Sequence, residues 1–453
     1  MYANKRMLTL GAGALASAMA LAACSSGAVS GDDGGASGDG GSATLNVATV
    51  NNPQMKDMEQ LKSEYEAANP GVTVNFQVMQ EADLRATVTA DVASGAGQYD
   101  IVTIGAYETP QWGANGWLVD LTDSLSSDSE YDVDDLLPPV RAVNSYEDKL
   151  FAVPFYGESS FLMYRKDILD DAGITFDGTP TWQEVADAAK EVDSSDMDGI
   201  CMRGKVGWGD LFGPLTTVIQ TFGGNWYDEN WDATVDTPEW KEAVGFYKTL
   251  LDESGEADPV SYSFPECLTA LKEEKAAMWA DATVAASLLE ADDSPVKGKM
   301  GYVPMPVVET DQSGWLWSWN LAVPASTKQQ DAAVDFVKWA TSKEYIQLVG
   351  EKIGWSNVPP GSRTSTYEIP EYQEAAAAYA PLTVEVMSSV NPAQPGVNPQ
   401  PYIGIQYVSI PEFQDVGNQC SQLVADYLAD RTSLDDALAE CQSIAQEAGD
   451  KQK

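Results

Sequence analysis

Histidine is absent from all 453 residues of this chain. The absence excludes Ser-His-Asp catalysis and the usual histidine zinc sites, and it removes the commonest general base near neutral pH. A hydrolase that works with a pair of carboxylates is not excluded, because such an enzyme needs no imidazole.

Basic residues are also scarce. Lys and Arg together number 26 against 69 Asp and Glu, which gives a formal net charge of −43 at pH 7. Such a charge repels nucleic acid and anionic lipid surfaces, and it disfavours a polyanionic substrate. The composition therefore favours an uncharged small molecule as ligand, and we expect no nucleic-acid partner.

Cysteine is rare, with five in the chain. Four of them follow Cys24, and four cysteines in an exported protein allow three disulfide pairings. None of the spacings is Cys-x-x-Cys, so we expect no metal site and no cofactor. We favour a disulfide between Cys420 and Cys441, and free buried thiols are the alternative for these two and for Cys201 and Cys267.

The N-terminus has the pattern of an export signal. Lys5 and Arg6 precede an apolar stretch over residues 7–21, which is too short to remain as a membrane-spanning helix. The sequence Leu21-Ala22-Ala23-Cys24 that ends this stretch resembles a lipobox.

A lipobox implies that a signal peptide of residues 1–23 is removed and that Cys24 is acylated. Residues 24–42 are mostly Ser, Gly, Ala and Asp, and this composition predicts a disordered tether. We therefore expect a protein that is lipid-anchored to the outer face of the cytoplasmic membrane. An ordinary secretory signal with an incidental cysteine is the alternative.

The next part of the chain alternates between strand and helix patterns. Strand patterns at 44–50, 72–79 and 99–104 are separated by helical periodicity at 57–68 and 83–94, as expected for a parallel sheet flanked by helices. Ligands on such sheets bind at the carboxyl ends of the strands. The residues that follow the predicted strand ends are Asn51, Asn52, Glu81 and Tyr107.

Several later passages resemble the extracellular solute-binding proteins of ABC importers, and in particular their sorbitol/mannitol-binding branch. The most specific are Met202-Arg203-Gly204 and Trp279-Ala280-Asp281-Ala282-Thr283-Val284. The resemblance covers about residues 46–448, and its passages are 150–173, 201–210, 222–226, 276–284, 316–324, 354–363 and 401–406.

The resemblance implies an α/β, two-lobe periplasmic-binding-protein-like fold of type II, with hinge strands that cross between the lobes. Lobe 1 would comprise residues 43–156 and 317–345, and lobe 2 residues 157–316 and 346–453. It further implies a monomer that closes on a polyol, such as mannitol, sorbitol or arabitol, or on a small sugar, and delivers it to ABC permease subunits in the membrane.

A polyol presents hydroxyl groups, which donate and accept hydrogen bonds, and apolar C–H faces. Its site needs carboxylates and amides, guanidinium and indole N–H groups, and aromatic rings. By position in the resembling motifs, Glu158 and Asp281 would accept hydrogen bonds from hydroxyls, although a solvated surface acid is the alternative for each.

Arg203 and Arg363 would bridge neighbouring hydroxyls, with a surface ion pair as the alternative. Trp315, Trp317 and Trp319 alternate and share one face of an extended segment, and we expect Trp319 to stack on the ligand. The remaining candidates for the ligand site are Trp208, Tyr107, Asn51 and Glu81.

Two other functions fit the sequence less well. The first is an extracellular glycoside hydrolase that uses Glu158 and Asp281 as its carboxylate pair. The second is a surface adhesin, for which the tether and the acidic surface would be the relevant parts. The order of the motifs along the chain favours the receptor over both.

Overall fold

The computed structural model describes residues 42–453. The predicted signal peptide of residues 1–23, the predicted acylation site Cys24 and all but the last residue of the predicted tether lie outside the described residues. Within residues 42–453, no helix is both long enough and apolar enough to cross a membrane.

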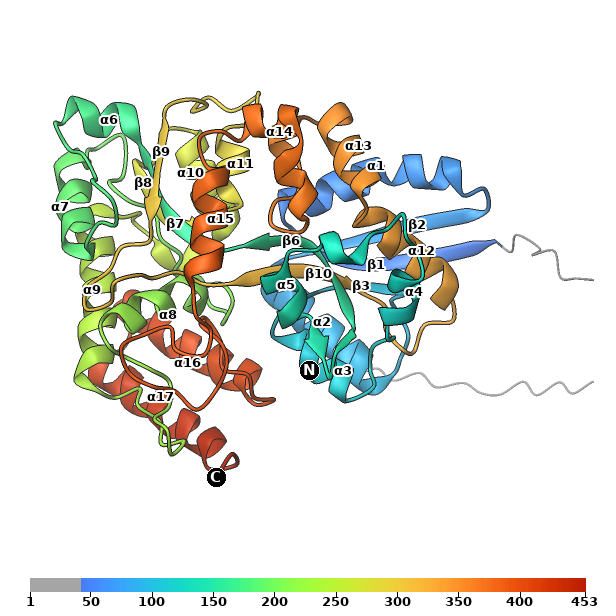
Figure 1. Ribbon diagram of the computed structural model, residues 1–453. Helices are drawn as coiled ribbons and strands as arrows, with labels where there is room; N and C mark the ends of the chain where they lie inside the picture. The colour runs from blue at the N-terminus through green and yellow to red at the C-terminus, as the bar shows by residue number, and fades with distance from the viewer. Residues whose placement is uncertain (1–41) are drawn as a thin grey trace, which may run out of the picture. The chain divides into compact units, whose positions relative to one another are not determined.

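A five-stranded sheet forms the centre of one half of the molecule, which we call lobe 1 together with the helices around the sheet (Figure 1). The strand order is β2-β1-β3-β10-β6. β1 pairs in parallel with β2 and β3, and β10 runs antiparallel to β3 and β6. The strands are β1 (Ala43–Val50), β2 (Val72–Met79), β3 (Ile101–Gly105), β6 (Ala152–Glu158) and β10 (Trp317–Ala322).

The β-α-β-α-β order predicted for residues 44–104 is confirmed. Helix α1 (Pro53–Ala68) connects β1 to β2, and α2 (Glu81–Ser94) connects β2 to β3. α1 begins four residues before the predicted start, because Pro53 occupies the first turn of the helix, where its missing N–H and fixed φ are tolerated. α2 ends at Gly95, which adopts a left-handed conformation with φ 65°.

A three-stranded antiparallel sheet of order β8-β7-β9 forms the centre of the other half, which we call lobe 2 together with its helices. Its strands are β7 (Ser160–Arg165), β8 (Met278–Ala282) and β9 (Met300–Pro304). Ser159 alone separates β6 of the first sheet from β7 of the second. The chain therefore passes from one sheet to the other within a few residues, and β6 and β10 lie side by side at this crossing (Figure 1).

Short and long helices surround the two sheets. Around the five-stranded sheet lie α3 (Glu108–Ala114), α4 (Thr122–Ser126), α5 (Pro138–Val143), α12 (Gln330–Ala340) and α13 (Lys343–Lys352). Lobe 2 contains α6 (Lys166–Asp171), α7 (Trp182–Val192), α8 (Phe212–Thr221), α9 (Pro238–Ser254), α10 (Phe264–Lys272), α11 (Ala285–Leu289), α15 (Ala380–Ser389), α16 (Phe413–Leu428) and α17 (Leu434–Gly449). A two-stranded hairpin of β4 (Ser145–Tyr146) and β5 (Lys149–Leu150), the helix α14 (Pro370–Ala375) and the 3-10 turns η1 (Val133–Asp135), η2 (Pro259–Ser261), η3 (Trp355–Asn357) and η4 (Thr364–Glu368) complete the fold.

Two disulfides lie in lobe 2. Cys420 of α16 pairs with Cys441 of α17, as we favoured from the sequence, and the Cα atoms are 5.0 Å apart. Cys201 pairs with Cys267 of α10 at a Cα distance of 5.6 Å. All four are buried, and the alternative of free thiols is wrong.

Candidate ligand-binding site

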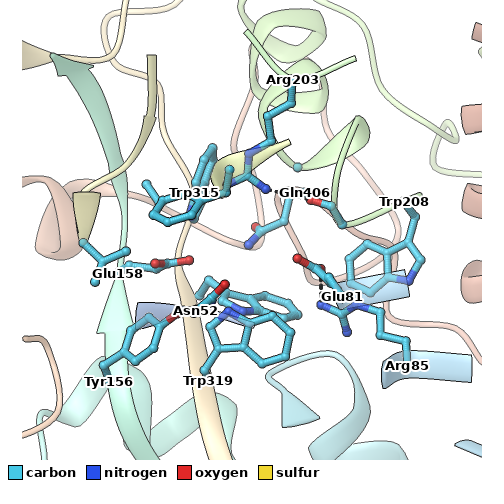
Figure 2. A pocket seen from close by; sticks show the side chains of 16 residues that line it. Asn52, Glu81, Arg85, Tyr156, Glu158, Arg203, Trp208, Trp315, Trp319 and Gln406 are labelled. Atoms are coloured by element: carbon cyan, nitrogen blue, oxygen red, sulfur yellow. Dashed lines mark hydrogen bonds and ion pairs between the residues drawn. The ribbon is translucent and has the colours of Figure 1, made fainter. Parts of the chain in front are cut away.

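A cavity that is partly open to solvent lies where the two lobes meet the crossing strands. Figure 2 shows polar and aromatic side chains of both lobes converging on this space. The residues that line it are Asn52, Glu81, Arg85, Tyr156, Glu158, Arg203, Trp208, Gly209, Gly213, Phe264, Ala282, Val284, Trp315, Trp317, Trp319 and Gln406.

β10 and the residue pair before it supply an aromatic wall. Trp315, Trp317 and Trp319 all line the cavity, so the predicted common face of this alternating segment is confirmed. The rings of Trp317 and Trp319 meet edge to face with centroids 5.7 Å apart. Gly105 on the neighbouring strand is needed for this packing, because a Cβ atom there would lie 1.9 Å from the Trp317 ring.

Arg85 of α2 is fixed among these rings. Its guanidinium lies 4.2 Å from the ring centre of Trp208, 4.9 Å from that of Trp319 and 5.1 Å from that of Trp317. It also forms ion pairs with Glu81 at 2.8 Å and with Glu108. Burial lowers the pKa of Arg85, but the two carboxylates more than offset this and hold it above its ordinary value.

Arg203 is the second arginine of the cavity, and Asp281 holds it. The Arg203 Nε donates to one Asp281 oxygen at 2.7 Å while Nη2 donates to the other at 2.5 Å. Asp281 also accepts from the Trp279 indole N–H at 3.0 Å and from a backbone N–H at 2.6 Å. Because Asp281 is fully buried and absent from the cavity wall, its carboxylate serves the protein and does not face the cavity.

Glu158 ends β6 and points into the cavity beside Tyr156 and Asn52 (Figure 2). The Asn52 amide donates to the Tyr156 hydroxyl at 2.7 Å. Burial raises the pKa of Glu158 to about 8, with Arg203 opposing the shift and the acids Asp281 and Glu81 adding to it. A carboxyl that keeps its proton near neutral pH can donate and accept hydrogen bonds.

The structure brings five of the nine candidate residues to one cavity, namely Glu81, Glu158, Arg203, Trp208 and Trp319. Besides Asp281, three others lie elsewhere. Asn51 lines a separate surface hollow with Lys56, and Tyr107 lies behind Trp208, where their ring centres are 5.3 Å apart.

Arg363 lies on the lobe 1 side of the molecule and is fully buried. Its guanidinium donates to the backbone carbonyls of Thr341 and Asp132 and pairs with Asp135 at 3.1 Å. It also lies 4.6 Å from the ring centre of Tyr131. Arg363 therefore forms an ion pair, as in the alternative considered from the sequence. The pair lies inside the protein and not on its surface.

Several residues of the cavity were not chosen as ligand candidates from the sequence, chiefly Arg85, Tyr156, Phe264 and Gln406. Asn52, which follows a predicted strand end, lines the cavity, as its position indicated. Helix α2 begins at Glu81 and not at residue 83 as predicted, so the position of Arg85 four residues after Glu81 on one helix face did not follow from the predicted bounds. Tyr156 and Gln406 belong to passages that carry the family resemblance, but nothing local in the sequence shows which way their side chains point.

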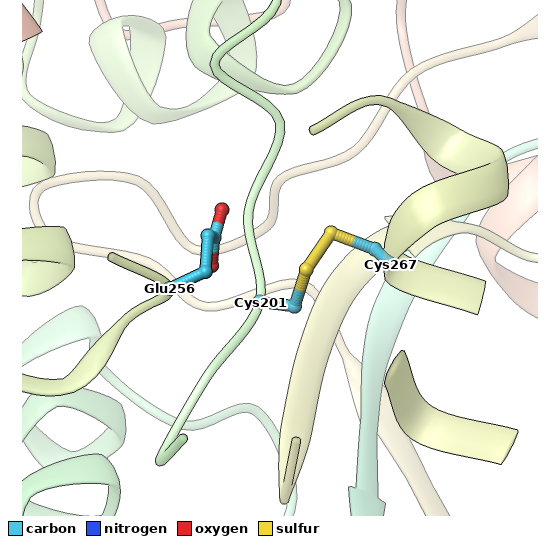
Figure 3. A group of neighbouring side chains, drawn as sticks. All are labelled: Cys201, Glu256 and Cys267. Atoms are coloured by element: carbon cyan, nitrogen blue, oxygen red, sulfur yellow. A yellow bond between two sulfur atoms is a disulfide. The ribbon is translucent and has the colours of Figure 1, made fainter. Parts of the chain in front are cut away.

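Cys201, Cys267 and Glu256 form the group of potential metal ligands within residues 42–453, with their ligand atoms within 4.8 Å of one another (Figure 3). The two sulfur atoms are joined in a disulfide, so they are not available as thiolate ligands. We therefore do not assign a metal to this group.

The crossing strands and the cavity between the lobes define a two-lobe α/β protein with the periplasmic-binding-protein-like fold, as the sequence predicted. The chain belongs to the bacterial extracellular solute-binding protein family, which matches residues 49–347.

One curated relative is the mannitol-binding protein of Pseudomonas aeruginosa, which is 41% identical over 406 residues, or 89% of this chain and 92% of the relative. A solved solute-binding protein of Agrobacterium vitis with bound D-mannitol is 44% identical with a TM-score of 0.88, covering 90% of this chain and 99% of that one. A ribitol complex from Agrobacterium radiobacter shares the fold, at 24% identity and a TM-score of 0.79 over 90% of this chain and 99% of that one.

The family is one of extracellular solute-binding proteins, and the two Agrobacterium structures are solute-binding proteins of ABC transporters. The resemblance found in the sequence is thereby confirmed. The glycoside hydrolase alternative is not supported, and Asp281, one of its two proposed carboxylates, is committed to Arg203.

Proposed function

We propose that this protein binds an uncharged polyol, of the size of D-mannitol, in the cavity between its lobes and delivers it to the permease subunits of an ABC importer. The observation that carries the proposal is the internal pairing of the charged groups around the cavity. Arg85 is paired with Glu81 and Glu108, and Arg203 with Asp281.

A charged ligand would have to compete with these pairs, whereas a hydroxyl can use the remaining donor and acceptor positions without breaking them. The raised pKa of Glu158 adds to this selectivity, because the carboxyl carries little charge near neutral pH. The cavity thus offers hydrogen-bonding groups and little unbalanced charge, which suits an uncharged ligand.

Each kind of surface on a polyol has a counterpart here. Glu158 would exchange hydrogen bonds with one hydroxyl, and Arg203 would donate to another from a position that Asp281 fixes. The amides of Asn52 and Gln406 would complete the polar contacts. Trp319 and Trp315 would cover the C–H faces of the carbon chain.

The cellular setting belongs to the same proposal. We propose that the protein acts as a monomer, anchored through Cys24 to the outer face of the cytoplasmic membrane, and that it releases its ligand unaltered. The relatives named as mannitol-binding support the ligand class, and the lipobox supports the anchor.

A calorimetric titration tests the proposal. The purified protein without its signal peptide is titrated with D-mannitol, sorbitol, arabitol, ribitol, glucose and maltose. We expect at least one polyol to bind with a dissociation constant of about 1 μM or below, which corresponds to about 8 kcal/mol. No heat and no shift of Tm with any polyol would contradict the polyol assignment, and release of product from aryl glycosides would contradict the non-enzymatic role.

A further inference from the structure

Tyr107 connects the two lobes without lining the cavity. It follows β3 of lobe 1 and precedes α3, yet its side-chain contacts are largely with lobe 2. Its hydroxyl donates to the backbone carbonyl of Ile410 at 3.0 Å and accepts from the backbone N–H of Gln414 at 3.2 Å.

The ring of Tyr107 also packs against lobe 2. Edge-to-face contacts join it to Trp208, Tyr407 and Phe413, at centroid distances of 5.3, 5.6 and 6.1 Å. Tyr107 is 4% exposed, which is as buried as a core residue. Its surroundings are therefore a socket formed by lobe 2 for a side chain of lobe 1.

Further contacts from lobe 1 to lobe 2 flank this socket. Arg85 lies against Trp208, and the Thr89 hydroxyl is 3.4 Å from the Gln414 side-chain oxygen. Gly209 allows Glu81 to approach, because a Cβ atom there would lie 1.8 Å from a Glu81 carboxyl oxygen. The structure is thus closed along this whole edge of the cavity.

We propose that Tyr107 is a closure residue, a positioning residue that sets ligand affinity by stabilising the closed arrangement of the lobes and not by touching the ligand. The inference rests on the proposed function, and it adds a residue outside the cavity that influences ligand affinity. When the lobes separate around the crossing strands, the hydrogen bond between the Tyr107 hydroxyl and the Ile410 carbonyl breaks, and each group bonds to water instead.

The thermodynamic consequence differs from that of a ligand contact. A ligand that binds the closed state gains or loses affinity in proportion to the population of that state. Loss of a closing contact therefore weakens all ligands by the same factor, and it leaves the order of preference among them unchanged.

The test compares Tyr107→Phe with Tyr227→Phe. Tyr227 is a matched control, because its hydroxyl donates to the backbone carbonyl of Ala445 at 2.9 Å, entirely within lobe 2. Both variants lose one phenol hydroxyl that is bonded to a backbone carbonyl, and both keep the aromatic ring. D-mannitol and ribitol are the probes, with Kd from calorimetry and Tm measured with and without D-mannitol.

For Tyr107→Phe we expect about tenfold weaker binding of each polyol that binds the wild type. This is the order expected when, in the closed state only, the Gln414 N–H loses its acceptor and the Ile410 carbonyl keeps only the Phe413 N–H as donor. The Tm of the free protein should stay at the wild-type value, and the increase of Tm with D-mannitol should shrink. Tyr227→Phe should lower Tm equally with and without D-mannitol and leave Kd unchanged.

Wild-type affinity in Tyr107→Phe, or a fall of Tm that is equal in the free and bound protein, would overturn the closure role while the proposed function stands. A changed ratio between the two polyols would show that Tyr107 contacts ligand, and would also overturn it. If the wild type fails to bind D-mannitol, the proposed function fails, and the closure role defined through that ligand falls with it.

Discussion

Two arginines line the cavity, and carboxylates of the protein hold each of them in place before any ligand arrives. Arg203 is gripped by both oxygens of Asp281, and Arg85 by Glu81 and Glu108 while it packs against indole rings. Such preorganisation lowers the entropic cost of binding, because the donors need not be ordered by the ligand. The pairing also keeps the charge of the cavity balanced in a chain of net charge −43.

Glu158 differs from the other acids of the site because it faces the cavity without a close cationic partner of its own. Replacement of Glu158 by Ala should weaken polyol binding by about 1–3 kcal/mol, since a ligand hydroxyl would be buried without its partner. Glu158→Gln should lose less, because the amide still donates and accepts. Calorimetry measures both, with the exposed Glu253→Gln as control. Equal affinity of Glu158→Ala and the wild type would show that the ligand lies elsewhere.

Glu256 gives the clearest pH prediction at the residue scale. It is 3% exposed and lies beside the Cys201–Cys267 disulfide (Figure 3). Burial raises its pKa from 4.5 to about 8. The folded protein therefore binds more protons than the unfolded chain between about pH 4.5 and 8, and the free energy of unfolding falls as pH rises through this window.

The variant Glu256→Gln removes this contribution. Relative to the wild type, it should gain on the order of a few kcal/mol in the free energy of unfolding between pH 5 and pH 8. Urea denaturation at the two pH values measures the difference, and Glu253→Gln on the surface is again the control. A parallel pH dependence of the wild type and Glu256→Gln would contradict the assignment of the raised pKa.

Residue types could be predicted for much of the site, but side-chain directions could not. The alternation of Trp315, Trp317 and Trp319 placed them on one face, because the period of a strand is two. Asp281 was expected to accept hydrogen bonds from ligand hydroxyls, and its pairing with Arg203 was not predicted, since the pairing joins residues 78 positions apart. Arg363 was expected to bridge ligand hydroxyls, whereas the structure buries its side chain against Tyr131.

At the scale of elements, local patterns sufficed where neighbours in sequence are neighbours in space. The first three strands and their two helices follow from the periodicity of the sequence. Helix α7 begins after Thr181 with a capping box between Thr181 and Glu184, which is also a local pattern. The insertion of β10 between β3 and β6 is different, because it joins residues more than 150 positions apart. Only the family resemblance indicated that return to lobe 1.

The contact between β3 and β10 makes a sharp prediction. In Gly105→Ala the new methyl group would overlap the Trp317 ring, so the ring must shift out of the cavity wall. We expect a loss of about 1–3 kcal/mol in the free energy of unfolding, as in other overpacked sites, together with weaker polyol binding. Denaturation and calorimetry measure the two effects.

The matched control is Gly245→Ala in α9, where the nearest atom to a new Cβ is a Leu434 methyl at 3.8 Å. Alanine is the better helix former, so this variant should be neutral or stabilised by up to about 1 kcal/mol, with unchanged affinity. Wild-type stability and affinity in Gly105→Ala would show that Trp317 is not confined by β3.

At the scale of the whole molecule, the two sheets are linked so that the cavity exists only when they come together. Its walls combine α2 and β10 from lobe 1 with Trp208, Phe264 and Arg203 from lobe 2. In the proposed function, a ligand bound there would tie the lobes to each other and so give the permease a closed form to distinguish from an open one. The acidic surface of the chain has no role in ligand binding in this proposal, because the proposed ligand is uncharged.

The most direct test of the account is a crystal structure of the protein grown with D-mannitol. We predict closed lobes and one mannitol molecule in the cavity, with hydroxyls hydrogen bonded to Glu158 and Arg203 and the carbon chain against Trp319. An empty cavity, or mannitol bound at another place on the protein, would contradict the central claim.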